Sequence, residues 1–301
     1  MVTGHTAPTE RRSRIATAMA KARVLTEAMP YIQAFSGETV VIKYGGSAMV
    51  DDDLRSSFAR DITLLGLLGL RPVVVHGGGP HITRAMARAD LEPQWVDGLR
   101  VTDKATFRVV LATLGYEINP DIVQLLSDHG ATAKGFMDPD SGLLIARRRH
   151  PDLGFVGEIV QVRTEAIQVL LERGVVPVVA PLACDEDGNH YNVNADTAAG
   201  AIAAAMQARK LIYLTDVEGL YRDFGDEDSL IDTIFLSDLR EMLGSASVSA
   251  GMLPKLESCI QALENGVRQA HILDGRIQHA VLLEVFTPEG IGTMITPQEK
   301  W

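Results

Sequence analysis

One stretch, residues 39–47, restricts the fold of this 301-residue chain more than any other. It reads Thr-Val-Val-Ile-Lys-Tyr-Gly-Gly-Ser, and its β-branched start predicts a buried strand that runs to Lys43. Gly45 and Gly46 follow, and a helical pattern begins around Asp51. Backbone amides at such a junction, the helix dipole and the lysine charge together favour a bound anion, most obviously a phosphate. Taken alone, the stretch is equally consistent with an ordinary turn and a surface lysine.

The same arrangement recurs in the next segment of the chain. Residues 72–76 predict a second buried strand, glycines 77–79 follow it, and a helix is predicted from about His81. The spacing is not the dinucleotide fingerprint G-x-G-x-x-G, but consecutive glycines let backbone amides approach a ligand closely. A purely structural glycine run is the alternative. We interpret His76, at the strand end, as an orienting or core residue rather than an acid–base catalyst.

Composition excludes some classes of function. The formal net charge of −11 argues against a general nucleic-acid binder, which needs a basic surface, but not against small anions held by local fields. The length allows one large α/β domain or two smaller ones, and no apolar run approaches the roughly 20 residues that span a bilayer. Cys184 and Cys259 lack metal-ligand spacing, so we expect a reduced cytoplasmic setting, with Cys259 in the core.

The N-terminal region is predicted to be a tail and a helix. Residues 1–9 are expected to be disordered, and residues 10–35 to form a helix that is kinked near Pro30. Its apolar stripe comprises Ile15, Ala18, Ala22, Leu25, Met29 and Ile32. An arginine-rich first half raises an organelle-targeting alternative. Because a helix ahead of the first strand has no place inside the domain, we favour a subunit interface.

Three further segments carry candidate site residues. Residues 94–102 predict a hairpin with Asp97-Gly98 at its turn, and Arg100 is either a surface charge or a clamp for a carboxylate. Asp103 is predicted to cap a long helix that ends near His129. In residues 189–196, Asn192, Asn194 and Asp196 precede an alanine-rich helix, and the alternative to a site role is helix capping by Asp196.

The C-terminal third adds carboxylates and a second lysine. A strand over residues 211–215 leads into a loop that carries Asp216 and Glu218, beyond the carboxyl end of the strand, where α/β sheets bind ligands. Lys255 falls in the first turn of a helix that stops at Asn265-Gly266; a cation there opposes the helix dipole, so a bound anion would explain it. Residues 271–296 are predicted to alternate strands and glycine turns.

Six motifs in order resemble the amino-acid kinase family, over residues 39–296. They are Ile-Lys-Tyr-Gly-Gly-Ser, His-Gly-Gly-Gly-Pro, Gly-Leu-Arg-Val-Thr-Asp, Asn-Val-Asn-Ala-Asp, Leu-Thr-Asp-Val-Glu-Gly-Leu and Gly-Met-Leu-Pro-Lys. One glycine motif would be weak, but the ordered set is specific. The third and fourth motifs are most similar to the members that phosphorylate N-acetyl-L-glutamate; members acting on glutamate or aspartate are the alternative.

The resemblance implies an α/β fold, a three-layer α/β/α sandwich around a mainly parallel sheet, with an N-terminal helical extension. Residues 1–36 would be a disordered tail and a kinked oligomerisation helix, and residues 37–301 a single kinase domain. Its N-terminal half would bind acetylglutamate and its C-terminal half ATP, with Mg²⁺ bound mainly through phosphates. The reaction would be phosphorylation of the side-chain carboxylate, the second step of arginine biosynthesis, in the cytoplasm.

The resemblance also assigns roles to residues. Lys43 and Lys255 would stabilise the transferring phosphoryl group, and Asp196 would position both lysines. Substrate would be bound by Gly78, Gly79, Asn192 and Arg100, with Arg100 on its α-carboxylate. The ATP-binding residues would be Gly45, Gly46, Thr215, Asp216, Val217 and Leu220. No protein metal site is implied.

Regulation is implied by the N-terminal helix and by the C-terminal run, which resemble the arginine-inhibited, hexameric class of the family. Such members are trimers of dimers with interlaced N-terminal helices. The expected arginine-binding residues are Tyr31, Lys210, His271, Glu284 and Gly292, with Glu284 pairing with the inhibitor. A catalytically silent arginine sensor is an alternative of another class. Some family members bind a nitrogen-signalling protein, and nothing in the sequence decides that point here.

Overall fold

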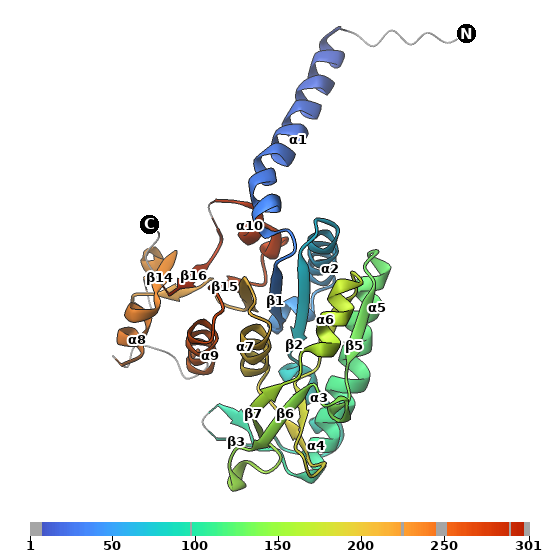
Figure 1. The fold of residues 1–301 in the computed structure, drawn as a ribbon, viewed down its shortest axis with the longest axis vertical. Helices are drawn as coiled ribbons and strands as arrows, with labels where there is room; N and C mark the ends of the chain where they lie inside the picture. Colours follow the sequence, from blue (N-terminus) through green and yellow to red (C-terminus); the bar gives the residue numbers. More distant parts are fainter. Residues whose placement is uncertain (1–7, 97, 224–225, 245–251, 289, 298–301) are drawn as a thin grey trace, which may run out of the picture.

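The computed structural model describes residues 8–96, 98–223, 226–244, 252–288 and 290–297. Its centre is an eight-stranded sheet in the order β14-β16-β15-β11-β1-β2-β8-β5 (Figure 1). The strands are β1 (Thr39–Tyr44), β2 (Arg71–His76), β5 (Ala133–Phe136), β8 (Val176–Val179), β11 (Lys210–Thr215), β14 (Thr233–Phe235), β15 (Gln269–Asp274) and β16 (Thr293–Thr296). Neighbouring strands are parallel, apart from the antiparallel pair β15 and β16.

Helices cover both faces of this sheet. On one face pack α2 (Asp52–Leu67), α5 (Asn119–Asp128) and α10 (Ala280–Phe286), and on the other α6 (Glu165–Glu172), α7 (Ala195–Ala205) and α9 (Leu253–Glu264). Because strand side chains alternate between faces, Val40 and Ile42 of β1 join the first core and Val41 joins the second. The predicted three-layer sandwich around a mainly parallel sheet is confirmed.

A second, smaller sheet lies beside the carboxyl ends of the central strands. It has the order β10-β9-β6-β7, made of β10 (His190–Asn192), β9 (Leu182–Cys184), β6 (Leu144–Arg148) and β7 (Gly157–Val162). The predicted hairpin is present as β3 (Trp95–Val96) paired with β4 (Leu99–Arg100). Asp97, predicted for its turn, lies outside the described residues. A third pair joins β12 (Leu220–Tyr221) to β13 (Leu230–Ile231).

The remaining segments are mostly helical. Asp103 caps a helical run as predicted, since its carboxylate accepts a hydrogen bond from Thr106 N at 2.7 Å. That run comprises α4 (Lys104–Leu111), a π-helical segment (Ala112–Ile118) and α5. The other helices are α3 (Gly79–Arg88) and α8 (Leu236–Gly244), with short 3₁₀ segments at Gly46–Met49, Pro139–Ser141, Pro151–Leu153 and Glu227–Ser229.

The N-terminal helix α1 (Pro8–Phe35) extends away from the sandwich (Figure 1). Its predicted stripe does not pack on the domain, because Ile15, Leu25 and Met29 are about half exposed or more. Phe35, at the end of the helix, is buried in the core beside α2. Residues 1–7, which belong to the predicted disordered tail, lie outside the described residues. A kink at Pro30 stays a prediction.

The prediction for residues 271–296 was partly wrong, because it missed helix α10. Val281 and Val285 are buried against the α2 side of the sheet, so packing supports a helix of only seven residues. Ser57 accepts a hydrogen bond from His279 N at 2.7 Å just before this helix begins. Among the described residues, no helix is both long and apolar enough to cross a membrane.

Candidate active site

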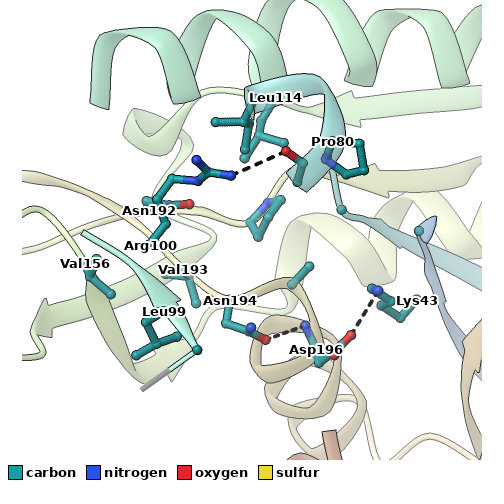
Figure 2. A pocket seen from close by; sticks show the side chains of 18 of the residues that line it. Lys43, Pro80, Leu99, Arg100, Leu114, Val156, Asn192, Val193, Asn194 and Asp196 are labelled. Carbon is teal, nitrogen blue, oxygen red and sulfur yellow. Dashed lines mark hydrogen bonds and ion pairs between the residues drawn. The ribbon is translucent and has the colours of Figure 1, made fainter. Parts of the chain in front are cut away.

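Alternation along β1 places Lys43 at the site. Lys43 shares its face of the strand with Val41, which belongs to the core on the α7 and α9 side. Its Nζ lies 3.1 Å from Asp196 Oδ1, and Asp196 is in the first turn of α7 (Figure 2). The lysine after the first strand is therefore a half-buried ion-pair partner and not a surface charge.

Asn194, rather than Asp196, caps α7, so the capping alternative for Asp196 was wrong. Asn194 Oδ1 accepts hydrogen bonds from Asp196 N at 2.9 Å and Thr197 N at 3.1 Å. This is the N-cap arrangement that satisfies the otherwise unpaired amides of a first helical turn. The Asp196 carboxylate is consequently available for the two lysines.

Lys255 approaches the same carboxylate from the opposite side. It lies in the first turn of α9, is 5% exposed, and its Nζ donates to Asp196 Oδ2 at 2.7 Å. The three side chains together carry two positive charges and one negative charge. Their net positive charge suits an anionic ligand, as expected from the unfavourable placement of Lys255 near a helix N-terminus.

The ionisation of this cluster follows from burial and charge. Burial alone would raise the pKa of the Asp196 carboxyl, but Lys43 and Lys255 outweigh it and lower the pKa to about 2. Burial lowers the pKa of the Lys255 ammonium, and Lys43 adds to this, whereas Asp196 opposes it. Asp196 is therefore an anion at every pH at which the protein would work.

A cavity of about 270 Å³ adjoins the cluster. It is lined by Lys43, Gly45, Gly46, Gly77, Gly78, Gly79, Pro80, Ile82, Trp95, Gly98, Leu99, Arg100, Leu114, Val156, Pro181, Asn192, Val193, Asn194, Ala195 and Asp196. The two predicted glycine turns, from β1 and β2, thus meet at one cavity. A Cβ at position 78 would lie 2.5 Å from Leu114 Cδ2, so any other residue there would displace this buried side chain.

Arg100 and Asn192 stand at the far end of this cavity from Lys43 (Figure 2). Arg100 is buried, with its guanidinium 4.4 Å from the centre of the Trp95 ring and its Nη2 2.8 Å from Thr83 Oγ1. Burial lowers the pKa of Arg100 from its ordinary value, yet a guanidinium stays charged. Asn192 Nδ2 donates to Thr102 Oγ1 at 3.3 Å. Arg100 is thus a buried cation and not a surface charge.

His76 is a core residue, as interpreted from its place at the strand end. It is fully buried, and its Nε2 lies 3.1 Å from Asn119 Nδ2. Burial lowers the pKa of the imidazole to about 4, so the ring is neutral at physiological pH. Its polar contacts orient Asn119, which also donates to Val178 O at 3.0 Å.

Gly45 and Gly46 of the predicted nucleotide residues line the cavity, and the other four lie at the end of β11 and after it. Asp216 Oδ1 accepts hydrogen bonds from Ser47 N, at 2.8 Å, and from Ser47 Oγ. Gly46 has φ +69°, and a Cβ there would lie 2.6 Å from Asp216 Oδ1. Leu220 is buried, and its N–H donates to Thr293 Oγ1 at 2.8 Å. Thr215, Asp216, Val217 and Leu220 do not line the 270 Å³ cavity.

Sequence reasoning missed Ser47, Trp95, Tyr213 and Ser258. Ser47 could have been found from its place after the glycines, because a hydroxyl and an amide there bond readily to a nearby carboxylate. Tyr213 gave no sequence signal. It becomes a neighbour of Lys43 only through the parallel pairing of β1 with β11.

Known proteins are similar to this chain along most of its length. Residues 38–274 match the model for the amino acid kinase family. The chain belongs to the amino-acid kinase family. The acetylglutamate kinase of Thermoanaerobacter pseudethanolicus is 51% identical over 95% of this chain and 96% of its own length. The resemblance inferred from the six motifs is therefore confirmed, and the predicted kinase activity with it.

Solved structures agree with this membership of the amino-acid kinase family. N-acetylglutamate synthase from Neisseria gonorrhoeae, complexed with coenzyme A and N-acetyl-glutamate, superposes with a TM-score of 0.82 at 28% identity. The match covers 93% of this chain and 64% of the synthase chain. The same synthase complexed with coenzyme A and L-arginine superposes with a TM-score of 0.78 at 27% identity over 92% of this chain and 65% of the synthase.

In this amino-acid kinase, the predicted arginine-binding residues partly converge. His271 is fully buried, with Nε2 3.1 Å from Lys210 Nζ and Nδ1 2.7 Å from Glu284 Oε1. Burial lowers the pKa of His271 to about 4, so the neutral imidazole accepts a hydrogen bond from Lys210 through Nε2, while its Nδ1 faces the Glu284 carboxylate. Glu284 also accepts from Ile291 N, next to Gly292, at 3.1 Å. Tyr31, on α1, packs against the core that lies on the α2 side.

Proposed function

We propose that this protein transfers the γ-phosphoryl group of ATP to the side-chain carboxylate of N-acetyl-L-glutamate, as a step of arginine biosynthesis. The observation that carries the proposal is the Lys43–Asp196–Lys255 cluster at one end of a cavity whose other end holds Arg100. The named activity of the 51% identical relative supports the choice of substrate.

The chemistry requires charge neutralisation more than proton transfer. A side-chain carboxylate is already ionised at neutral pH, so the acceptor needs no general base. The barrier comes from bringing one anion against a polyanion, and from negative charge spread over the equatorial oxygens of a loose transition state. Lys43 and Lys255, fixed by one carboxylate, are placed to offset this charge without rearranging during the reaction.

The cavity fits an acceptor with two carboxylates and an amide. Arg100 would hold the α-carboxylate through its planar guanidinium, and Asn192 would bond to the acetamido group. Backbone amides of Gly78 and Gly79 can approach closely, because no side chain stands in the way. This arrangement directs the side-chain carboxylate of the substrate toward Lys43.

Magnesium would be carried mainly by the nucleotide. In the parts of the chain that the structure describes, no three His, Cys, Asp or Glu side chains are grouped to hold a metal ion. Mg²⁺ usually keeps phosphate and water ligands and needs few from protein. The ion would neutralise charge on the phosphates, while the lysines act on the transferring group.

An assay of ADP release with MgATP tests the proposal directly. N-acetyl-L-glutamate, L-glutamate and L-aspartate are compared as acceptors, and acyl phosphate is trapped with hydroxylamine. We expect turnover with the acetylated acceptor only. Turnover restricted to glutamate or aspartate would show a related kinase instead, and no turnover with any acceptor would favour a catalytically silent sensor.

We also propose feedback inhibition by L-arginine in a hexamer, a trimer of dimers. The His271–Glu284 pair supports this, because the Glu284 carboxylate is buried beside the base of α1, where a cationic inhibitor would pair with it. The related Neisseria synthase has been solved with L-arginine. Repeating the assay with increasing arginine tests this part, and constant turnover would refute it.

A further inference from the structure

Two hydroxyl groups behind the lysines connect the strands to the helices of the site. Tyr213 of β11 pairs with Lys43 of β1 in the parallel register, so both side chains point toward α7 and α9. Tyr213 is fully buried, and its OH lies 2.7 Å from Ser258 Oγ of α9. One hydrogen-bonded pair therefore joins β11 to α9 directly beneath the catalytic cluster.

This pair converges on the backbone of Asp196. Ser258 Oγ donates to Asp196 O at 2.8 Å, and Tyr213 OH lies 3.3 Å from the same oxygen. Since a hydroxyl has one proton, the shorter distances assign the order Tyr213 OH to Ser258 Oγ to Asp196 O. A Cβ at Gly200 would overlap Ser258 Oγ, so α7 has a glycine where α9 approaches.

The same tyrosine ring faces Lys255. The Lys255 ammonium lies 5.1 Å from the centre of the Tyr213 ring, within the range of a cation–π interaction. Such an interaction is strongest away from water, and Lys255 is 5% exposed. The ring therefore stabilises the protonated lysine at a place where burial disfavours it.

We propose that Tyr213 and Ser258 are positioning residues, which hold Asp196 and Lys255 in the geometry that phosphoryl transfer needs. This inference rests on the proposed function. Neither side chain lines the 270 Å³ cavity, so neither contacts the acceptor there. Ser258 borders a second cavity of about 640 Å³, but its hydroxyl donates to Asp196 O and the Tyr213 ring faces Lys255, so both act through Asp196 and Lys255. Their effect is on turnover more than on substrate affinity.

The charge state of Lys255 provides the readout. The titratable groups that face it are Asp196 from α7, Lys43 from β1, Tyr213 from β11 and Cys259 from its own helix. Burial raises the pKa of the Cys259 thiol and of the Tyr213 hydroxyl, so both stay neutral where the enzyme works. Loss of the Tyr213 ring would lower the pKa of Lys255 further, and turnover would be lost at a lower alkaline pH.

Tyr213→Leu, Tyr213→Phe and Ser258→Ala test the proposal, with Ile202→Val as a control that removes one methylene from the buried face of α7. For Tyr213→Leu we expect kcat to fall on the order of tenfold. The alkaline limb of its pH–kcat profile, where turnover is lost as Lys255 deprotonates, should move to lower pH. Tyr213→Phe keeps the ring and should leave the limb in place. Ser258→Ala should lower kcat several-fold, and KM for both substrates should change by less than about twofold. The control should leave both kcat and the limb unchanged.

A second measurement separates this inference from the proposed function. The chain has seven lysines, so NMR of ¹³C-labelled lysine can follow the Lys255 signal, assigned with Lys255→Arg, without any turnover. Its titration should move to lower pH in Tyr213→Leu even if N-acetyl-L-glutamate were not the substrate. An unmoved titration together with an unmoved alkaline limb would overturn the proposal. If Tyr213→Leu does not fold, Ser258→Ala tests the proposal in its place. A kcat equal to that of the wild type in Ser258→Ala would overturn the proposal.

Discussion

Lys43 and Lys255 share the Asp196 carboxylate and carry the same charge, but they are not interchangeable. Lys43 reaches Asp196 Oδ1 from the end of a strand, and Lys255 reaches Oδ2 from the start of a helix. Each is therefore held in a separate direction around Asp196, as electrostatic preorganisation would require of lysines that we propose to act on the transferring group. Neither lysine can replace the other.

Removal of either lysine should lower turnover much more than substrate binding. For Lys43→Ala and for Lys255→Ala we expect kcat to fall on the order of 10²–10³-fold, because each supplies charge that matters most in the transition state. Steady-state kinetics measure the change. Lys104→Ala, at an exposed position, is the matched control and should retain full kcat. Near-normal turnover in Lys43→Ala would contradict the assignment of Lys43 to the transferring phosphoryl group.

Asp196→Asn should destabilise the protein in a way that depends on pH. The change leaves two cations without their anion, and breaking a buried pair typically costs about 3 kcal/mol or more of unfolding free energy. Burial lowers the pKa of Lys255 in the folded protein below its value in the unfolded chain. Between these two pKa values the unfolded chain binds more protons, so the free energy of unfolding rises with pH there.

Urea unfolding at pH 7 and pH 9.5 measures this dependence. The difference between Asp196→Asn and the wild type should narrow at the higher pH, as Lys255 in the variant loses its proton and the uncompensated charge disappears. Asp196 itself, with its pKa lowered to about 2, stays ionised over this range in the wild type and contributes no slope. A difference that is constant or grows with pH would contradict the charge assignment.

At the scale of elements, helix α1 is attached by a very short connection to β1, the strand that carries Lys43. It ends at Phe35, and β1 starts at Thr39. Phe35 is buried, and the Lys210 ammonium lies 5.3 Å from its ring. The helix thus ends against the cluster that we propose to bind arginine, while its outer length exposes Met19, Val24 and Leu25. An exposed apolar face of this kind suits packing against another subunit.

Deletion of residues 1–27 should separate assembly and regulation from catalysis. We expect an active dimer that arginine no longer inhibits, because the part of α1 that we propose to interlace between dimers is lost while every residue of the cavity remains. Sedimentation gives the mass, and the ADP-release assay with arginine gives the inhibition. A control lacking only residues 1–7 should behave as the full chain. A truncated protein that is still hexameric and still inhibited would refute the assignment of α1.

At the scale of the whole molecule, residues 37–301 are predicted to unfold as one unit. The resemblance implies that the N-terminal half binds acetylglutamate and the C-terminal half ATP, but both hydrophobic cores rest on the same strands. Val40 belongs to one core and Val41, its neighbour on β1, to the other. Urea transitions followed by far-ultraviolet and near-ultraviolet circular dichroism should therefore coincide. Two separate midpoints would indicate that the halves fold as distinct domains.

The sequence by itself determined most of the elements and the residues of the candidate site. Strand and helix periodicity, glycine turns and the Asp103 cap depend on neighbours a few residues apart, so they could be predicted locally. The ordered motifs likewise named Lys43, Arg100, Asp196 and Lys255. Helix α10 was missed because its seven residues depend on packing against the core beside α2 and not on local propensity.

Only the tertiary structure decided how these residues are used. Asp196 and Lys255 lie 59 residues apart in the chain. Because Asn194 caps the helix, the Asp196 carboxylate is left to pair with both lysines. The Tyr213–Ser258 pair depends on the β1–β11 register and on the close approach of α7 and α9. Register and helix approach are set by the packing of whole elements, which local sequence patterns do not specify.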